Sequence, residues 1–449
     1  MKQAPFLPKI STPKSRGAGL ILVIAVCAIV SLLTGIMYSR YLIERHSLKN
    51  LVRSIQNGYT AEAGIKKAFY YLKADPKKGI NWRTGNLWAD TLLKDRIFSS
   101  INDEVSLSVI DDAGYLRIKS QCRNKSVEIQ AAGILPDSLK TTLTLISSKP
   151  LIINAGSRIT GNVRFNLEPQ FRGGSMEGTV ETNSGITLPA ANFNSFFEAI
   201  KFDRYLLATP QVFEKELVSP QRFSPVNPLP AKKIFVNDAV LMDNNSSDSI
   251  WMVGSGLVIA STAEIQVSGR TYLSEANLLA IGPVKILDQT RLNEGRVYSE
   301  TSIEIADEAV VSGLLIAPEI KICGHAVIDN PGIVYTGPPF KTGIVSIQDQ
   351  TLVQACIIDA GDGKSFKVET GPNVKIEGLI YSLAAITHHG KFTGYMYCRT
   401  FYEPVTGSDT ANTNILSGRI LNADNVNYFP VPVIFSQIRD YIPIKWREN

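Results

Sequence analysis

The sequence has few of the residues that build metal centres and nucleophilic sites. Its 449 residues include only four histidines and five cysteines. His46 and His325 stand alone, and His388 and His389 form an adjacent pair. Because a zinc site needs its ligands within tetrahedral reach of one another, these separations argue against a metal centre and favour histidines in turns or at the surface. We expect neither a metal nor a cofactor.

A pair of catalytic acids is also missing. Glycan-cleaving enzymes use two carboxylates that flank one bond, whereas the acids of the C-terminal half are scattered. They are Asp288, Asp307, Glu308, Asp329, Asp349, Asp359 and Asp362. No spacing places two of them on one face, although the same acids and glycines leave weak calcium binding open. The stretch DAGDGKS (359–365) lacks the first glycine of a phosphate-binding loop. We expect that the protein is not an enzyme.

Net positive charge is nearly absent outside the N-terminus. The formal charge is +5, and Lys2, Lys9, Lys14 and Arg16 account for most of it. The rest of the chain shows no basic stripe with interleaved aromatic residues, the pattern typical of nucleic-acid binding. We therefore expect no nucleic acid among its partners.

One long stretch carries no charge at all. Residues 17–39 are uncharged and lie between Arg16 and Arg40. As a helix this run reaches about 34 Å, enough to cross a bilayer core of about 30 Å. A secretory signal has a shorter apolar stretch and small residues at its exit, and neither feature is present. The sequence predicts a retained, single-pass transmembrane helix.

The charges that flank this run are nearly balanced, so the positive-inside rule alone does not orient it. The basic leader at 1–16 is short and is therefore the easier end to leave in the cytoplasm. We expect a cytoplasmic N-terminus, a span in the inner membrane, and the bulk of the chain in the periplasm or outside the cell.

The helical pattern continues past the apolar run. Apolar residues recur mostly three or four apart, which is typical of one face of an amphipathic helix. They are Leu48, Leu51, Val52, Ile55, Tyr59, Ile65, Phe69 and Leu72. Gly58 and Gly64 weaken the pattern, and Asp75-Pro76 ends it. The sequence predicts one helix over 17–75, which a membrane anchor followed by a stalk would also explain.

Three features of this region occur together. The leader ends in Ser15-Arg16-Gly17, the apolar run opens at Ala18, and TAEAGIKKAFYYL (60–72) follows in the amphipathic part. In these features the chain resembles the type IV pilin superfamily, most closely the PilX-like minor pilins and the K-type minor pseudopilins. The resemblance implies a prepilin-peptidase cut after Gly17 and other pilin-like subunits as partners.

The resemblance also implies that the mature helix packs in a filament. The residues that would make those contacts are Leu20, Leu22, Val26, Ile29 and Leu33. Most members carry glutamate at the fifth mature position, where this chain has Leu22. K-type minor pseudopilins also lack that acid, and in that group its absence goes with a place at the filament tip.

Residues 76–136 are expected to form a small α+β head. Apolar spacing over 82–101 predicts one or two short helices. EVSLSVIDDAGYLRIKSQC (104–122) alternates around a turn sequence and predicts a hairpin, and KSVEIQAAGIL (125–135) predicts a third strand. Such a meander on the distal part of the long helix also resembles the head of PilX-like proteins, although any small α+β domain fits the pattern.

From residue 140 onward, short β-branched runs recur around a glycine. The copies are RITGNVRF (158–165), QVSGRTYL (266–273), LNEGRVYS (292–299), VVSGLLIA (310–317), NPGIVYTG (330–337), KIEGLIYS (375–382) and KFTGYMYC (391–398). Residues 303–319 also align with 320–336. Recurring glycines with short strands are typical of a solenoid, because glycine accepts positive φ at tight bends. A β-sandwich also has short strands but needs no glycine column.

These patterns predict a mainly β protein with a long N-terminal transmembrane α-helix, a small α+β head and a parallel β-helix (β-solenoid). We expect eight to ten coils and a rod of about 40–50 Å. Its first rungs span 137–188, a helical and proline-rich insertion at 189–232 covers an end or a side, the solenoid resumes over 233–425, and 426–449 cap the last coil. In pattern only, the rungs resemble the β-helical bactofilins.

With this topology, four cysteines would lie in an oxidising compartment. Cys122, Cys323, Cys356 and Cys398 allow three connectivities if all of them pair, and Cys323 and Cys356 could meet on stacked rungs. Free buried thiols are an equally open alternative.

The leading functional hypothesis is a structural protein. It is a pilin-like minor subunit of a type IV pilus or a type II secretion-like filament, anchored by its N-terminal helix and displaying a rigid solenoid. Gly17 and Ala18 would be its processing residues. One alternative is a permanently anchored scaffold that self-associates end to end. Another is a membrane-tethered glycan-binding or glycan-acting protein.

Overall fold

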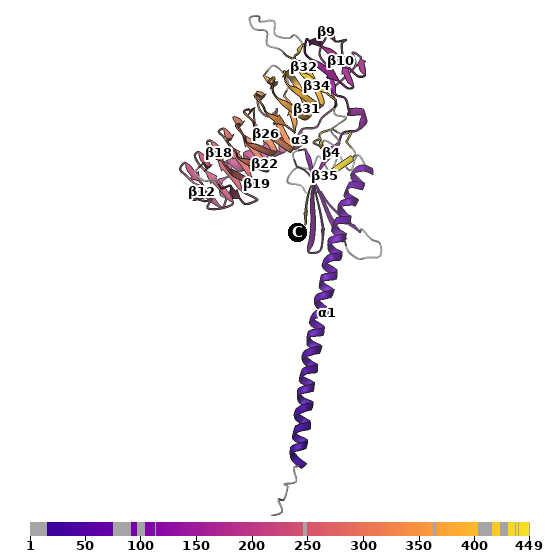
Figure 1. Ribbon diagram of the computed structural model, residues 1–449, viewed down its shortest axis with the longest axis vertical. Helices are drawn as coiled ribbons and strands as arrows, with labels where there is room; N and C mark the ends of the chain where they lie inside the picture. The colour runs from indigo at the N-terminus through magenta and orange to yellow at the C-terminus, as the bar shows by residue number, and fades with distance from the viewer. Residues whose placement is uncertain are drawn as a thin grey trace, which may run out of the picture.

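The computed structural model describes residues 16–74, 91–96, 104–112, 114–245, 249–361, 365–402, 415–422, 430–435, 437–438 and 440–448. It consists of a long helix, a small antiparallel sheet and a rod of stacked strands (Figure 1). Strands make up 47% of the chain and the rod is a parallel β-solenoid. The predicted fold class is therefore confirmed.

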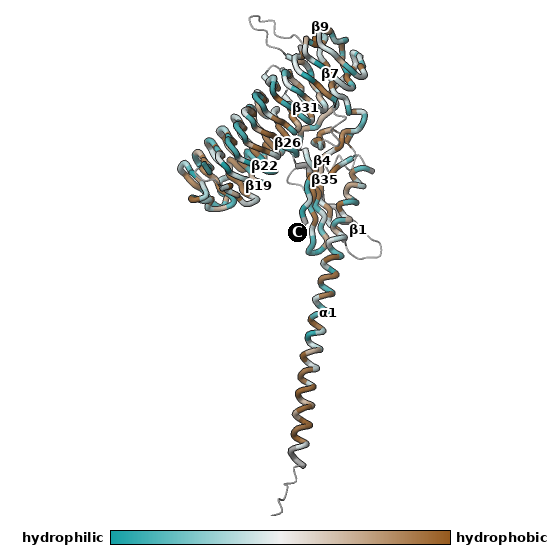
Figure 2. Tube along the Cα trace, viewed as in Figure 1, coloured by the Kyte–Doolittle hydropathy of each residue, from teal (hydrophilic) through white to brown (hydrophobic). Residues whose placement is uncertain are grey.

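Helix α1 (Arg16–Ala74) is continuous over 59 residues, as its apolar and amphipathic patterns predict. Its C-terminal part packs on the sheet of the head, where Ala61, Ile65, Ala68 and Leu72 are buried at the helical spacing. Every residue from 19 to 53 is exposed. The helix therefore has a docked half and a free half (Figure 2).

The head is one antiparallel sheet in the order β1-β2-β3-β4-β35. Its strands are β1 (Thr91–Arg96), β2 (Glu104–Asp112), β3 (Tyr115–Cys122), β4 (Lys125–Ile134) and β35 (Asp440–Glu448). The predicted hairpin and third strand are confirmed by β2, β3 and β4. The helices predicted over 82–101 are wrong for 91–96, which form an edge strand on β2. The rest of that segment lies outside the described residues.

The C-terminal segment was predicted to cap the last coil, and this prediction is wrong. Strand β35 pairs with β4 from Asp440↔Ile134 to Glu448↔Val127 and completes the sheet of the head. Just before it, Val431 pairs with Gly133, and Phe435 packs on Tyr397 of the rod. The apolar residues that precede β35 therefore pack between the head and the rod.

Gly64 is required by the close approach of α1 to the sheet. A Cβ atom at this position would lie 2.1 Å from Ser120 Oγ and 2.8 Å from Val105 Cγ1. Glycine costs about 1 kcal/mol in a helix interior, so the docking surface explains why it is tolerated. By contrast, a Cβ atom at Gly58 would meet no atom within 4 Å.

We expect Gly64→Leu to destabilise the protein and Gly58→Leu not to. Gly64→Leu overpacks the helix–sheet contact and should lower the free energy of unfolding by about 1–3 kcal/mol. Gly58→Leu removes a helix-interior glycine without a clash and should be neutral or stabilising by up to about 1 kcal/mol. Chemical denaturation of the full chain in detergent measures both. Equal effects of the two changes would contradict this account of Gly64.

The rod is a three-sided solenoid in which the longer strands turn a corner and serve two or three faces. Face A contains, in stacking order, β12 (Lys215–Leu217), β14 (Lys233–Val236), β17 (Val258–Ser261), β20 (Asn277–Ala280), β22 (Arg291–Ser299), β24 (Val310–Ile316), β26 (Val327–Thr336), β29 (Cys356–Asp359), β31 (Lys375–His388), β32 (Lys391–Phe401), β5 (Leu143–Leu145), β8 (Val163–Phe165) and β11 (Val180–Thr182).

Faces B and C complete each coil. Face B contains β13 (Gln221–Phe223), β15 (Val240–Asn244), β18 (Ile265–Gly269), β21 (Val284–Ile286), β23 (Ser302–Ile305), β25 (Glu319–Ile322), β27 (Gly343–Ile347), β30 (Phe366–Thr370), the ends of β31 and β32, β33 (Ile415–Leu416), β6 (Ile152–Asn154) and β9 (Gln170–Arg172). Face C contains β16 (Trp251–Val253), β19 (Thr271–Ser274), the starts of β22, β24, β26, β31 and β32, β28 (Leu352–Val353), β34 (Arg419–Leu421), β7 (Arg158–Thr160) and β10 (Ser175–Glu177).

The solenoid has about 13 turns, more than the eight to ten predicted. At about 4.8 Å per coil this gives a rod of about 60 Å. Inward side chains stack in register, as in the buried column Ile259, Leu278, Val297 and Leu315. The predicted alignment of 303–319 with 320–336 is confirmed, because Ile303 pairs with Ile320 on the next rung.

The coils do not stack in chain order. The coil that ends in β34 is followed in the stack by β5, β6 and β7, with Met396 paired to Leu143 and Arg419 to Arg158. The chain then crosses back along the rod to begin again at β12. The three faces follow one another in the same order on both sides of this junction. Backbone pairing and the shared apolar core of the rod hold the two sides together.

Helix α3 (Asn194–Ala208) carries the chain back along face A. Four contacts with successively lower rungs trace its path: Phe193 with Tyr381, Phe196 with Tyr335, Arg204 with Tyr298, and Phe213 with Phe235. A short 3-10 turn (Pro210–Val212) follows. The predicted helix is confirmed and covers a side of the rod, not an end. The proline-rich segment is not a separate strap, since β12 and β13 form the first coil.

Face A also attaches the rod to the head. Its outward column runs in register through nine rungs, and every member is at least 97% buried. The members are Phe235, Ala260, Leu279, Tyr298, Ile316, Tyr335, Ile358, Tyr381 and Tyr397. Together with α3, residues 431–435, Ile438 and the head they form one apolar cluster. Rod and head are therefore joined by a continuous core.

Candidate membrane and assembly segment

The predicted assembly residues lie on the free half of α1. Their exposed fractions range from 52 to 68%: Leu20, Leu22, Val26, Ile29 and Leu33. Leu22, Val26, Ile29 and Leu33 recur at helical spacing and share one face, while Leu20 lies on the other side. The structure thus brings four of the five together as one apolar stripe.

This stripe is part of a helix that is apolar all round. Its most apolar 18-residue window has a mean hydropathy of 2.9, and none of that window is buried. An all-round apolar helix is stable in water only when something covers it. It is the one helix in the described part of the chain that is long and apolar enough to cross a membrane. A membrane-spanning helix and a signal sequence both fit that description.

The predicted processing residues Gly17 and Ala18 fall in the first turn of α1. The rest of the leader lies outside the described residues. Processing after Gly17 therefore stays a prediction.

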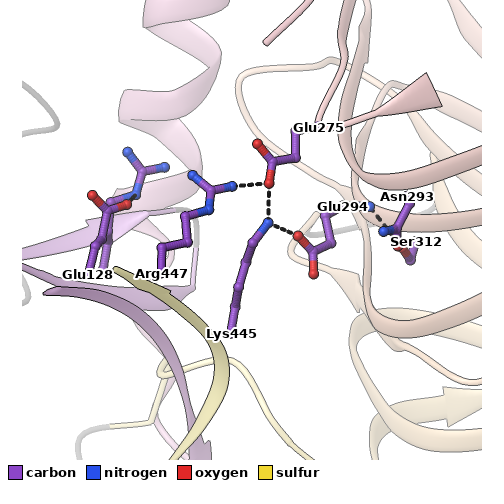
Figure 3. A network of polar contacts seen from close by, with 8 residues as sticks. Glu128, Glu275, Asn293, Glu294, Ser312, Lys445 and Arg447 are labelled. Atoms are coloured by element: carbon purple, nitrogen blue, oxygen red, sulfur yellow. Dashed lines mark hydrogen bonds and ion pairs between the residues drawn. The ribbon is translucent and has the colours of Figure 1, made fainter. Parts of the chain in front are cut away.

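The free half of α1 and the far end of the rod lie at opposite ends of the molecule (Figure 1). Between them, the C-terminal strand makes a charged bridge from head to rod. Lys445 forms ion pairs with Glu275 and Glu294 on two adjacent rungs, and Arg447 pairs with Glu275 (Figure 3). Burial alone would raise the pKa of Glu275, but the hydrogen bonds and charges of Lys445 and Arg447 outweigh it and lower that pKa.

Glu275 and Glu294 both adopt left-handed backbone conformations, each with φ of 52°. Such a conformation is unfavourable for a residue with a Cβ atom. Here it turns both carboxylates toward the cavity of about 490 Å³ between head and rod. A second link joins α3 to the rod, where Arg204 makes a bidentate pair with Glu300 at 2.6 and 2.8 Å. The ion pairs of Lys445 and Arg447 fix the rod against the head, and the pair of Arg204 fixes α3 on the rod, in addition to the apolar core.

The acids predicted to be scattered are partly brought together. Asp288, Asp307 and Asp349 lie at one corner of the rod with positive φ. Asp288 accepts a hydrogen bond from the N–H of Gly269 at 2.9 Å, and Asp349 accepts one from the N–H of Gly324 at 2.9 Å. The prediction that no two acids share a face was therefore wrong. Their carboxylates accept hydrogen bonds from backbone N–H groups of a neighbouring rung and so stabilise the turns at this corner.

The turn or surface position predicted for the histidines is wrong for His388. This side chain is buried between rungs, with Nδ1 2.8 Å from Thr370 Oγ1. Burial lowers its pKa to about 4. His325 is exposed at a turn. In the part of the chain that the structure describes, no three His, Cys, Asp or Glu residues are grouped to hold a metal ion.

All five cysteines are free thiols. Cys323 follows β25 on face B and Cys356 begins β29 on face A, so the two do not meet on stacked rungs. Cys122, Cys356 and Cys398 are buried in the cores of head and rod. Burial raises the pKa of the Cys356 thiol and of the Cys398 thiol well above their ordinary value. Buried, protonated thiols of this kind behave as small apolar side chains.

Comparison with known proteins gives little sequence similarity. No family model matches the chain, and no curated protein matches it. Two solved structures are similar at a low level. The competence-associated pilin ComZ from Thermus thermophilus is 11% identical, with 88% of this chain and 97% of that chain covered and a TM-score of 0.20. An ice-binding protein from an Antarctic Flavobacteriaceae bacterium is 10% identical, with 65% and 98% covered and a TM-score of 0.10.

Proposed function

We propose that the protein is a structural, pilin-like minor subunit of a type IV pilus or a type II secretion-like filament. Its partners are then other pilin-like subunits, the prepilin peptidase and the inner membrane. In this proposal the leader stays in the cytoplasm, while head and rod lie in the periplasm or outside the cell. The protein acts through its shape and catalyses no reaction.

The observation that carries this proposal is the free half of α1. An ordinary membrane anchor needs about 20 apolar residues. The segment that joins such an anchor to its domain does not have to be helical. Here one unbroken helix runs from the apolar segment into the core of the head. Such a helix can leave the bilayer and pack against similar helices while the head and rod stay fixed to it. The stripe of Leu22, Val26, Ile29 and Leu33 supplies an apolar surface for that packing.

Processing of the leader tests the proposal. We expect the protein purified from native membranes to begin at Ala18 when the prepilin peptidase is active and at Met1 when it is not. Intact mass and N-terminal sequencing measure this. Gly17→Leu should abolish the cut, because the resemblance implies cleavage directly after Gly17 and the change puts a bulky side chain there. Gly19→Leu, two positions further on, is the matched control and should be processed.

Normal maturation of Gly17→Leu would contradict the proposed processing. A chain that still begins at Met1 in the presence of the active peptidase would favour a permanently anchored scaffold in place of a filament subunit.

A further inference from the structure

Stacking of the coils creates a row of positive charges that is scattered in the sequence. On face C, Lys375 pairs with Lys391, Lys391 with Arg419, and Arg419 with Arg158, each directly in register on the next rung. All four side chains are exposed. Four cations therefore lie in one line along the rod axis, about 4.8 Å apart.

Like charges directly opposite one another destabilise a sheet, and the other in-register strand pairs described in the rod contain none. On face B the matching outward column runs Lys285, Glu304, Lys321, with signs alternating from rung to rung. Lys321 bonds Glu304 at 2.9 Å. The row on face C is thus an exception to the charge pattern of the same solenoid.

Acids do not neutralise most of this row. Arg158 pairs with Glu177 at 2.7 Å, and Glu377, beside Lys375, accepts a hydrogen bond from Gln354 at 2.8 Å. No ion pair of Lys375, Lys391 or Arg419 is found within the described residues. The positions two residues before Lys375 and Lys391 are Asn373 and His389, which carry no negative charge. Such a row of exposed cations is complementary to an anionic partner.

We propose that Lys375, Lys391 and Arg419, with Arg158 at the end of the row, bind a linear acidic polysaccharide that lies along the rod. One cation per rung suits a polymer with one carboxylate per sugar, because a rung of about 4.8 Å is close to the length of one sugar in an extended chain. Thr393 and Asn373, beside the row, offer hydrogen bonds to sugar hydroxyl groups.

Two other anionic partners fit less well. Single-stranded nucleic acid binds through aromatic rings on which bases stack, and the outward positions of β7, β34 and the starts of β31 and β32 carry no aromatic residue. A lipid surface is out of reach, because these strands lie at the end of the molecule opposite the free half of α1 (Figures 1 and 2).

Binding of polygalacturonate to the full chain in detergent tests the proposal. We expect Lys375→Gln/Lys391→Gln/Arg419→Gln to weaken binding by about tenfold or more. The matched control is Lys285→Gln/Lys321→Gln/Lys367→Gln, which removes the same charge from face B and should bind as the unaltered chain does. Added salt should weaken binding, and the methyl ester of the polymer should not bind. Lys391→Gln alone gives the same test with the least change to the fold.

Equal loss in the two triple variants, or binding of the neutral ester, would overturn the proposal. So would no binding of polygalacturonate at low salt, or tighter binding of a single-stranded oligonucleotide through the same three residues. The proposal does not depend on leader processing, so a chain that keeps Met1 leaves it untouched.

Discussion

Replacing Gly313 by valine is expected to prevent the solenoid from forming a stable rod. Gly313 sits at the corner between faces C and A with φ of 113°. A Cβ atom there would lie 2.0 Å from the carbonyl oxygen of Gly295 on the next rung. The clash is with backbone, which cannot move without breaking the ladder, and a β-branched residue does not adopt this φ. We expect a loss of more than about 4 kcal/mol.

The matched control is Gly254→Val, since a Cβ atom at Gly254 would meet nothing within 4 Å. Strand content by circular dichroism and the resistance of the rod to trypsin measure both variants in the full chain. We expect Gly254→Val to match the unaltered protein and Gly313→Val to lose protection throughout the rod. Unchanged strand content and trypsin resistance for Gly313→Val would show that the glycine column is not needed.

The repeat could be found from sequence because most copies mark the same corner. Gly295, Gly313 and Gly332 stack in register, as do Gly378 and Gly394, and the residue three positions later is the outward aromatic or aliphatic residue of face A. The copy at 266–273 marks a different corner, because Gly269 lies at the end of β18 on face B, just before β19 on face C. Glycine has positive φ at both corners, at Gly269 in one and at Gly313, Gly378 and Gly394 in the other, so the pattern does not separate them.

The order of the coils could not be read from the sequence. Leu143 stacks on Met396 through backbone hydrogen bonds and an apolar contact that any aliphatic pair would provide. The same holds for β35, whose alternating residues suit a strand in the head as well as a cap on the rod. Residues 91–96 show the opposite case, in which local helical spacing was overridden by pairing with β2.

The candidate membrane segment was predictable because an uncharged run of this length is long enough to cross a bilayer as one helix. The basic row was not predictable, since Lys375 and Arg419 are neighbours only after stacking. Because these residues are far apart in the sequence, the sequence alone shows no basic stripe in this region. For sequences of this kind, charge patterns are informative within a rung and uninformative between rungs.

Asp359→Asn is expected to make the protein about 4 kcal/mol more stable than the unaltered chain at pH 8 but not at pH 4. Asp359 points into the solenoid with none of its surface exposed. Burial raises its pKa from 3.8 to about 7, although Ser382 Oγ and the N–H of Gly361 donate hydrogen bonds to it. The folded state therefore holds a proton between pH 4 and 7 that the unfolded chain has lost, and stability falls as pH rises through that range.

His388 works in the opposite direction and must be separated from this effect. Its pKa falls from 6.5 to about 4 on folding, so its contribution to stability is present above pH 6.5 and is lost as pH falls toward 4. The two groups offset each other in the unaltered protein. The difference between the Asp359→Asn protein and the unaltered protein removes His388 from the comparison, because both chains contain it. Denaturant unfolding at pH 4, 6 and 8 measures this difference, and a value that does not grow with pH would show that Asp359 is ionised in the folded state at all three.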